Sequence, residues 1–458
     1  MKTVTILFSF LYFLINFAFE IQKCTIMTLY HLLGFDPKSM SLRTEIIAGA
    51  TTFLTMCYIL AVNPAILSTT GMDRAALFTS TALASAIATL LLAFLAKMPF
   101  AQAPSMGLNA FFAFTICQAL GYTWQQALAI SFVEGVIFLL ITFVHVREYI
   151  LYAIPTNLRY AISVGIGMFI AFIGLKNAGI IVSNPNTFVS LGKFTPTAIL
   201  GIIAILISGV LMARNVKGSL FYAIILATII GIPMGVTVVP GHWMPVSLPQ
   251  SIAPVFCQFD FQGLLNFHTV MLVVSLLLVN IFDTVGTLVG LAYKTRVVRD
   301  DGTIPHISEA MMSDAIGTTV GSVLGTSTIT TYVESASGIA EGGRSGMTSL
   351  TVGMLFLASL FLSPVFMLIP GAATSGALVM VGVLMLDNVK RMNLSAIDES
   401  FPAFITMTTM VLCYSIADGI CLGILSYVAM KLCVRKWNEL NAVLLILSAI
   451  FILNFVFA

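Results

Sequence analysis

The chain has 458 residues, of which 59% are hydrophobic and 9% are charged, and its formal net charge is +2. Soluble domains carry about 25% charged residues, so this composition excludes a soluble globular protein and indicates an integral membrane protein with many spanning helices. The small positive excess does not indicate nucleic-acid binding, and no nucleic-acid partner is expected. The seven cysteines include no CxxC pair, so we expect no metal site, no disulfide framework and no cofactor.

The chain begins with an apolar stretch, residues 1–26, which carries Lys2 near its start and has no small-x-small cleavage site. This stretch is either a signal-anchor helix or an extension ahead of a translation start at Met27. We assign residues 1–40 to an N-terminal extension and a cytoplasmic lead-in, and attach no function to them.

Apolar stretches of membrane-spanning length follow one another from residue 41 to the end of the chain. Two of them, spans 3 and 10, are short and rich in Gly, Ser, Thr or Pro, so we expect broken elements there that line a cavity buried in protein. The fourteen predicted spans, followed by an apolar stretch at 441–457, are 46–69, 76–96, 100–119, 125–145, 157–175, 196–213, 219–237, 268–291, 307–324, 326–340, 347–369, 373–387, 401–415 and 418–434.

The basic residues predict the orientation, because cytoplasmic loops of membrane proteins are enriched in Lys and Arg. If span 1 is entered from the cytoplasm, sixteen basic residues lie inside and three lie outside. We therefore predict a multi-pass protein of the cell membrane, in contact with lipid, with a cytoplasmic start. The sixteen are Lys38, Arg43, Lys97, Arg147, Arg159, Arg214, Lys217, Lys294, Arg296, Arg299, Arg344, Lys390, Arg391, Lys431, Arg435 and Lys436, and the three are Arg74, Lys176 and Lys193.

The two halves of the chain carry polar interruptions at matching positions. Asn63 in span 1 corresponds to Asp283 in span 8 at an offset of 220, and Asn109 in span 3 corresponds to Glu334 in span 10 at an offset of 225. Each half has seven spans, an odd number, so the second half enters the membrane from the opposite side. The predicted fold class is an all-α polytopic membrane protein with about 14 spans in a 7+7 inverted repeat. Its site is expected at the midplane, between breaks in spans 1, 3, 8 and 10.

Asp283 and Glu334 are the first candidates for the site. An ionised Asp near the centre of a membrane helix costs roughly 3 kcal/mol, so such residues face a polar cavity or a partner. We expect one carboxylate to accept hydrogen bonds from N–H groups of an uncharged solute, and one to titrate and couple transport to protons. The alternative is a structural pair, in which each acid is bonded to neighbouring Thr, Ser or backbone groups.

Three residues near these acids are further binding candidates. The Asn109 amide can donate to and accept from a ring edge, although Asn is also a good helix cap. Gly107 permits close approach of the backbone to a ligand. Thr287 lies one helical turn beyond Asp283 and either contacts the ligand or orients the carboxylate.

For a second tier of polar residues we expect mainly structural roles. Asn63 either joins the site or satisfies backbone carbonyls at the break made by Pro64. Glu134 and Asp314 are buried-looking acids that we expect to act as supports or ties between domains. The segment from Glu341 to Arg344 lies at the predicted cytoplasmic end of span 10 and suits a hinge or a gate latch.

Four long motifs resemble those of the nucleobase–ascorbate transporter (nucleobase:cation symporter-2) superfamily. They are FDTVGTLVG in span 8, APSMGLNAFFAF in span 3, TTYVESASGIAEGGRSG through span 10, and the PAF…YSIADG stretch late in the chain. Within the superfamily the chain is most similar to the adenine/guanine/hypoxanthine permeases, and APSMGLNAFF resembles the guanine/hypoxanthine permeases most. The similarity runs from about Ser41 to the C terminus.

The resemblance implies a core domain of spans 1–4 and 8–11 (residues 41–146 and 241–369) and a gate domain of spans 5–7 and 12–14 (residues 147–240 and 370–458). It implies proton-coupled, elevator-type import of purine nucleobases, with hypoxanthine and guanine favoured over adenine and the proton as coupling ion. A homodimer formed through the gate domain is also implied. Asp283, Glu334 and Asn109 match the family's base-binding positions, and Val333, beside Glu334, is assigned to the same set.

Three alternatives remain open. The same architecture could carry another nucleobase or another small neutral or anionic solute, although an anion would meet two acids with no Lys or Arg nearby. An ion channel needs a continuous polar path, which the sequence does not display. An enzyme is the least favoured, because no nucleophile–base pair, metal cluster or phosphate loop is evident.

Overall fold

The structure is a computed structural model that describes residues 27–28, 30–143, 155–240, 244–264, 266–295 and 305–457. The predicted N-terminal extension, 1–26, lies outside these ranges, as do the basic residues Arg147, Arg296 and Arg299. Among the described residues, seven helical segments are long and apolar enough to cross a membrane, and four shorter apolar helices accompany them. The total of about 14 spans and the inverted relation of the halves stay predictions.

One group of helices packs around α4, which contacts α3, α12 and α14. Small residues allow these helices to approach closely. A Cβ added at Gly317 of α12 would lie 2.9 Å from Ala88 of α4, and one added at Gly353 of α14 would lie 2.8 Å from Leu90 of α4. The members of this first group are α2 (Leu42–Met56), α3 (Ile59–Leu67), α4 (Arg74–Leu95), α6 (Trp124–Phe143), α11 (Phe267–Thr295), α12 (Ile307–Leu324), α13 (Ser335–Ala340) and α14 (Gly346–Ser359).

A second group packs around α8 and α16, which cross at two glycines. A Cβ at Gly382 of α16 would lie 2.5 Å from the carbonyl oxygen of Gly167 of α8, so neither position has room for a side chain. The members of this group are α8 (Thr156–Asn177), α9 (Pro196–Ala213), α10 (Ser219–Gly231), α16 (Gly371–Met385), α17 (Ile397–Leu412) and α18 (Ile416–Cys433).

Shorter elements connect and extend these helices. The hairpin of β2 and β3 joins α8 to α9, and α19 contacts both α18 and α11. The connecting elements are η1 (Ser68–Thr70), β2 (Ile181–Asn184), β3 (Phe188–Leu191), η3 (Leu360–Leu362), α15 (Ser363–Met367), η4 (Leu386–Arg391), η5 (Trp437–Glu439) and α19 (Ala442–Phe457).

Spans 3 and 10 are broken, as predicted, and each consists of a short strand followed by a short helix. Span 3 contains β1 (Gln102–Pro104), α5 (Met106–Ala110) and the π-helical η2 (Phe111–Ala119), and span 10 contains β4 (Ile329–Thr331) and α13. The strands β1 and β4 pair antiparallel, with Ala103 opposite Thr330. Each strand thereby satisfies backbone groups that lipid could not. We call this strand pair the β1–β4 crossing. The strict all-α prediction is therefore wrong at the crossing and at the β2–β3 hairpin.

The predicted break in span 1 is wrong in position, and the predicted break in span 8 is wrong altogether. Span 1 is interrupted at Cys57 and Tyr58, between α2 and α3, whereas Pro64 lies inside α3. Membrane helices tolerate such a proline where neighbouring elements bury it. Span 8 is one continuous helix, α11, that passes through Asp283, because the single Gly286 does not interrupt the helical hydrogen bonds.

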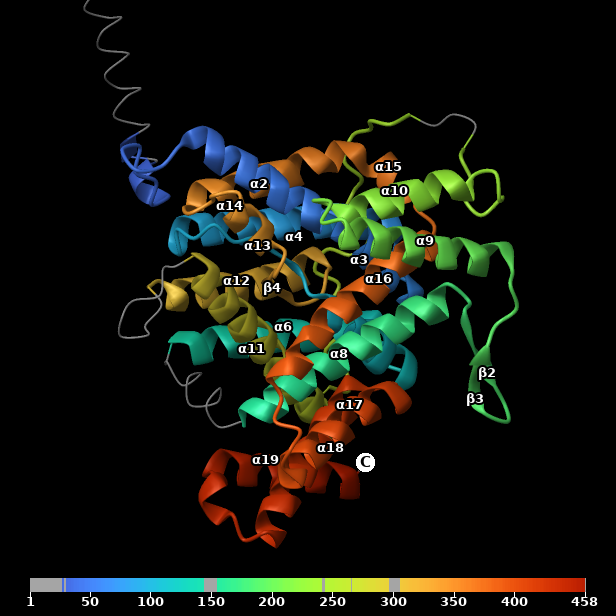
Figure 1. The fold of residues 1–458 in the computed structure, drawn as a ribbon, viewed down its shortest axis with the longest axis vertical. Coiled ribbons are helices and arrows are strands. Elements are labelled where there is room, and N and C mark those ends of the chain that lie inside the picture. Colours follow the sequence, from blue (N-terminus) through green and yellow to red (C-terminus); the bar gives the residue numbers. More distant parts are fainter. Residues whose placement is uncertain are drawn as a thin grey trace, which may run out of the picture.

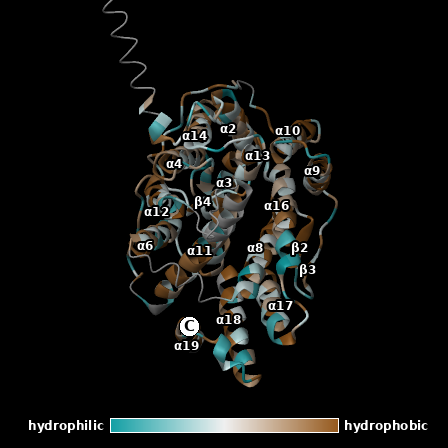
Figure 2. Ribbon diagram, turned by 60° about the vertical axis from the view of Figure 1, so that its left-hand side comes forward, coloured by the Kyte–Doolittle hydropathy of each residue, from teal (hydrophilic) through white to brown (hydrophobic). Residues whose placement is uncertain are grey.

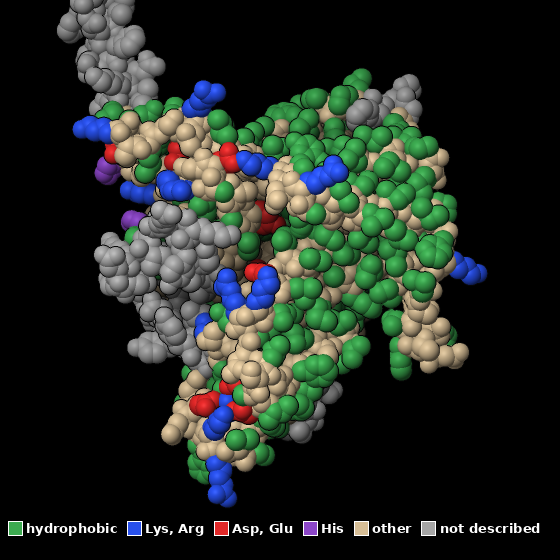
Figure 3. Space-filling view, viewed as in Figure 1, with side chains coloured by type: hydrophobic (Ala, Val, Ile, Leu, Met, Phe, Trp, Pro, Cys, Tyr) green, Lys and Arg blue, Asp and Glu red, His purple; other side chains and the backbone are tan. Residues whose placement is uncertain are grey.

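The figures show how the two groups surround the crossing. Elements of both groups are labelled in Figure 1, and the turned view of Figure 2 shows α3, α11, α13 and β4 between α4, α6, α12 and α14 on one side and α8, α9, α10 and α16 on the other. Figure 3 shows a broad apolar face on the part of the molecule that carries α9 and α10. Most of the charged side chains visible in that view lie outside this face, toward the opposite edge, through the middle of the view and at the lower end.

Candidate functional site

Asp283 projects from α11 onto the β1–β4 crossing. Its Oδ2 accepts a hydrogen bond of 2.9 Å from Ser105 Oγ, at the start of α5, and one of 3.3 Å from Thr330 Oγ1 in β4. Asp283 as a whole residue is half-buried. Its carboxylate is thus tied to both broken spans.

Glu334 follows β4 directly and precedes α13. Its Oε1 accepts a hydrogen bond of 2.5 Å from the hydroxyl of Tyr58. Glu334 is half-buried, and the neighbouring Val333 has an exposed fraction of 59%. The strand residues ahead of this pair are buried, so the chain emerges from the interior at Val333 and Glu334.

The alternation of side chains along β4 separates the buried acids. Thr328 and Thr330 point to one side of the strand, toward Glu134 and Asp283, because successive side chains of a strand alternate in direction. Thr331 points to the other side, where its hydroxyl lies 3.0 Å from Oδ1 of Asp314. Threonines in β4 and directly ahead of it therefore contact three of the carboxylates selected from the sequence.

The two second-tier acids lie in fully buried networks. Glu134 accepts 2.8 Å and 3.3 Å hydrogen bonds from Asn280 Nδ2 and Thr328 Oγ1, which joins α6 to α11 and to the start of β4. Asp314 accepts hydrogen bonds from Gln102 Nε2 and Thr331 Oγ1, which joins α12 to both strands. Both arrangements have the form of supports within the first group of helices.

Asn109 is not a helix cap, and Asn63 does not bond to backbone carbonyls of the described residues, the two structural alternatives considered for them. Asn109 lies inside α5 with Oδ1 accepting a hydrogen bond from Ser327 Oγ, and Ser105 occupies the position ahead of that helix, so Asn109 is not its cap. Asn63 Nδ2 donates to Thr81 Oγ1 at 2.7 Å and to Thr326 Oγ1 at 2.9 Å, not to carbonyls at the proline. Both side chains connect to the segment just ahead of β4.

Gly107 and Thr287 complete the predicted binding set. Gly107 faces the second group, because a Cβ added there would lie 2.8 Å from Cγ2 of Ile166 in α8. Thr287 is buried on α11, one turn beyond Asp283. The broken spans therefore lie where the two groups of helices meet.

A further charged contact links the two groups away from the crossing. Lys217, in the connection between α9 and α10, forms an ion pair with Glu341 at the end of α13. Nearby, Glu45 of α2 accepts a 3.0 Å hydrogen bond from the backbone N–H of Arg344, ahead of α14. The segment from Glu341 to Arg344 is thus bonded to both groups.

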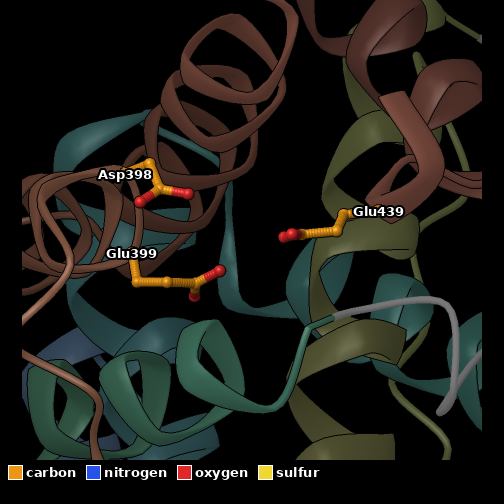
Figure 4. Close-up of side chains that lie close together, drawn as sticks. All are labelled: Asp398, Glu399 and Glu439. Atoms are coloured by element: carbon orange, nitrogen blue, oxygen red, sulfur yellow. The ribbon is translucent and has the colours of Figure 1, made fainter. Parts of the chain in front are cut away.

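Three carboxylates converge at the lower end of the molecule, those of Asp398, Glu399 and Glu439 (Figure 4). Their oxygens lie within 4.8 Å of one another, but the Lys431 ammonium binds all three, at 2.7, 2.6 and 2.5 Å. The ammonium supplies the positive charge that a metal ion would otherwise bring. Hydrogen bonds from Lys431 and Lys436 lower the pKa of Asp398, which precedes the predicted span 401–415, to about 2.

The sequence did not identify Tyr58, Ser105 or Thr330 as contacts of the two acids. Ser105 and Thr330 lie within motifs that drew attention, but their hydroxyls had no feature that distinguished them from neighbouring ones. Tyr58 lies 276 residues from Glu334, so no local pattern could connect them.

A protein-family model described as "Permease family" (Xan_ur_permease) matches residues 43–422. The chain belongs to this permease family. It is therefore an integral protein of the cell membrane and a transporter rather than an enzyme, and the resemblance found in its motifs is confirmed.

Members of this permease family resemble the chain over nearly its whole length. The adenine permease AdeP of Escherichia coli is 42% identical, over 91% of this chain and 93% of AdeP. The guanine/hypoxanthine permease PbuO of Bacillus subtilis is 39% identical, over 93% of this chain and 99% of PbuO. These identities do not distinguish whether the chain is more similar to adenine permeases or to guanine/hypoxanthine permeases.

Solved structures of anion transporters share the fold of this permease. The transmembrane domain of the cyanobacterial bicarbonate transporter BicA matches with a TM-score of 0.63 and 16% identity, over 84% of this chain and 97% of that domain. Murine Slc26a9 matches with a TM-score of 0.61 and 13% identity, over 91% of this chain and 72% of that protein. At such identities the likeness extends to the fold and not to the solute.

Proposed function

We propose that this permease imports purine nucleobases together with protons, and that Asp283 and Glu334 hold the base. The observation that carries the proposal is the position of the two half-buried acids. They flank one antiparallel strand pair, beside the exposed Val333, in a chain 42% identical to an adenine permease and 39% identical to a guanine/hypoxanthine permease.

The chemistry of the site suits a neutral, flat solute with N–H donors. Carboxylate oxygens accept hydrogen bonds from such donors, and hydrogen bonds to charged groups are the stronger class. An anion would be repelled by two acids, so the shared fold with anion transporters does not favour an anion here. Hypoxanthine and guanine are the proposed substrates and adenine is the alternative.

We further propose that the first group of helices is a mobile core and the second group a static gate. The crossing of β1 and β4, Gly107 and the two acids belong to the proposed core, and the close approach of Gly107 to Ile166 in α8 supports a site at the boundary with the proposed gate. Coupling to one proton would contribute about 2.3 kcal/mol per 100 mV of membrane potential to accumulation of the base. The expected inverted repeat and cytoplasmic start of span 1 belong to this proposal.

The test is uptake of radiolabelled hypoxanthine by cells that lack their own purine permeases. Unlabelled guanine, adenine, uracil, bicarbonate and sulfate serve as competitors, with and without a protonophore. Asp283→Ala should abolish uptake at an unchanged amount of protein in the membrane, whereas Asp36→Ala, at an exposed acid ahead of span 1, should not. Uptake by Asp283→Ala at the wild-type rate would refute the assignment of the site.

A second assay identifies the acid that couples transport to protons. Asp283→Asn and Glu334→Gln are each tested for protonophore-sensitive accumulation and for exchange of internal unlabelled base against external labelled base. An amide at the coupling position should prevent accumulation and retain exchange, because exchange requires no net proton movement. Accumulation by both variants would refute proton coupling through these acids.

A further inference from the structure

Tyr58 lies at the interruption of span 1, between the end of α2 and the start of α3. Its side chain is 1% exposed, and its hydroxyl donates a 2.5 Å hydrogen bond to Oε1 of Glu334. A hydroxyl-to-carboxylate hydrogen bond of this length is of the strong, charge-assisted class. The interruption thereby brings a buried donor to one of the two acids proposed to hold the base.

The same segment also holds the backbone of Glu334. The hydroxyl of Thr55 lies 3.4 Å from the carbonyl oxygen of Glu334 and 2.9 Å from the hydroxyl of Ser337, in the first turn of α13. Contacts with span 1 therefore restrain both the backbone and the side chain of Glu334.

These contacts leave one oxygen of the carboxylate for a ligand. Within the part of the chain that the structure describes, Oε1 of Glu334 accepts a hydrogen bond from Tyr58, and no side chain of another residue donates to Oε2. Glu334 is half-buried beside the exposed Val333, whereas Tyr58 is buried. The two carboxylate oxygens therefore differ, because Oε1 is held by a buried side chain and Oε2 is not.

We infer that Tyr58 is a positioning residue: its hydroxyl holds the Glu334 carboxylate so that Oε2 faces an N–H group of the bound purine. A Glu side chain has several rotatable bonds, and fixing it before the base arrives removes an entropic cost from binding. The inference rests on the proposed function, in which Glu334 binds the base.

The test compares Tyr58→Phe with the wild-type protein in hypoxanthine uptake. The phenylalanine keeps the buried ring and removes only the hydroxyl. Loss of a hydrogen bond to a charged group should raise the KM about tenfold or more, with a smaller change in the maximal rate. Tyr427→Phe, an equally buried tyrosine in α18, is the matched control and should keep the wild-type KM.

Competition by methylated purines gives a readout that packing alone would not change. Hypoxanthine is methylated in turn at N1, N7 and N9, and a derivative that lacks the N–H bound by Glu334 should compete poorly for uptake by the wild-type protein. In Tyr58→Phe the carboxylate is free to rotate, so the ratio between the affinities for hypoxanthine and for that derivative should fall at least fivefold. An unchanged KM together with an unchanged ratio would overturn the inference and leave the proposed function standing.

Two further outcomes are covered. If Tyr58→Phe does not reach the membrane, 4-fluorophenylalanine at position 58 fills the volume of the hydroxyl without donating a hydrogen bond to Glu334. The KM should then rise at least twofold, and an unchanged KM would overturn the inference. Absence of uptake of any purine by the wild-type protein would overturn both the proposed function and the inference.

Discussion

Replacement of Gly107 by alanine tests whether the core and gate groups must meet closely at the site. The added methyl would lie 2.8 Å from Cγ2 of Ile166, whereas carbon atoms in contact are ordinarily about 3.5–4.0 Å apart. Either α5 or α8 must therefore move by roughly 1 Å, and overpacking of this kind costs about 1–3 kcal/mol. The two helices belong to different groups, so the cost falls on the arrangement of the groups. This free-energy cost corresponds to a drop of about 5- to 150-fold in the population of proteins in which the two groups pack as they do in this structure.

The assay is the initial rate of hypoxanthine uptake, divided by the amount of protein in the membrane. Gly107→Ala should reduce it strongly, and Gly107→Ala combined with Ile166→Ala should approach the rate of Ile166→Ala alone, because the clashing methyl is gone. Gly209→Ala is the control, since a Cβ there would lie 3.9 Å from its nearest neighbour, Met380. A wild-type rate in Gly107→Ala, or no recovery in the double variant, would refute the reasoning.

Three other predictions concern charged groups. Lys217→Glu and Glu341→Lys should each change the uptake rate by up to about fivefold, because a partly exposed ion pair is worth at most about 1 kcal/mol. The double variant, in which the two charges are exchanged, should recover the wild-type uptake rate. Additive effects in the double variant would contradict a direct contact. Lys431→Met removes the ammonium that the three carboxylates share, leaving only Lys436 on Asp398, and should destabilise the purified protein by about 3–5 kcal/mol in thermal unfolding; an unchanged melting temperature would contradict the cluster's role. The pKa of Asp398 is lowered from 3.8 to about 2, so its contribution to stability is complete above about pH 4 and lost as the pH falls through 2. The melting temperature should fall over that range, and fall less in Asp398→Asn; equal falls would contradict this assignment.

Local properties of the sequence were sufficient for the class of protein and for the selection of its candidate site residues. Hydropathy and the scarcity of charge identified membrane helices, because each span must be apolar along its own length. Spans 3 and 10 were identified as broken because Gly, Ser, Thr and Pro gather within them, and the structure has a strand and a short helix in each. Asp283 and Glu334 were selected because an acid inside an apolar stretch needs a polar environment, and both lie at the strand crossing.

Contacts between distant parts of the chain could not be predicted in this way. Nothing local in the sequence indicates that Ala103 lies opposite Thr330, or that the hydroxyl of Tyr58 reaches Glu334 across 276 residues. The predicted break at Asn63 was wrong for the same reason, since Pro64 interrupts a helix or is accommodated in it according to what packs around it.

The sequence by itself therefore determined the membrane class, the broken spans and the two acids, because these follow from the composition of single segments. Only the tertiary structure decided which acids stay half-buried and which are enclosed by the fold, because burial depends on contacts between distant segments. Near β4, for example, side chains alternate across the strand, so the half-buried Asp283 bonds to Thr330 on one side and the fully buried Asp314 bonds to Thr331 on the other.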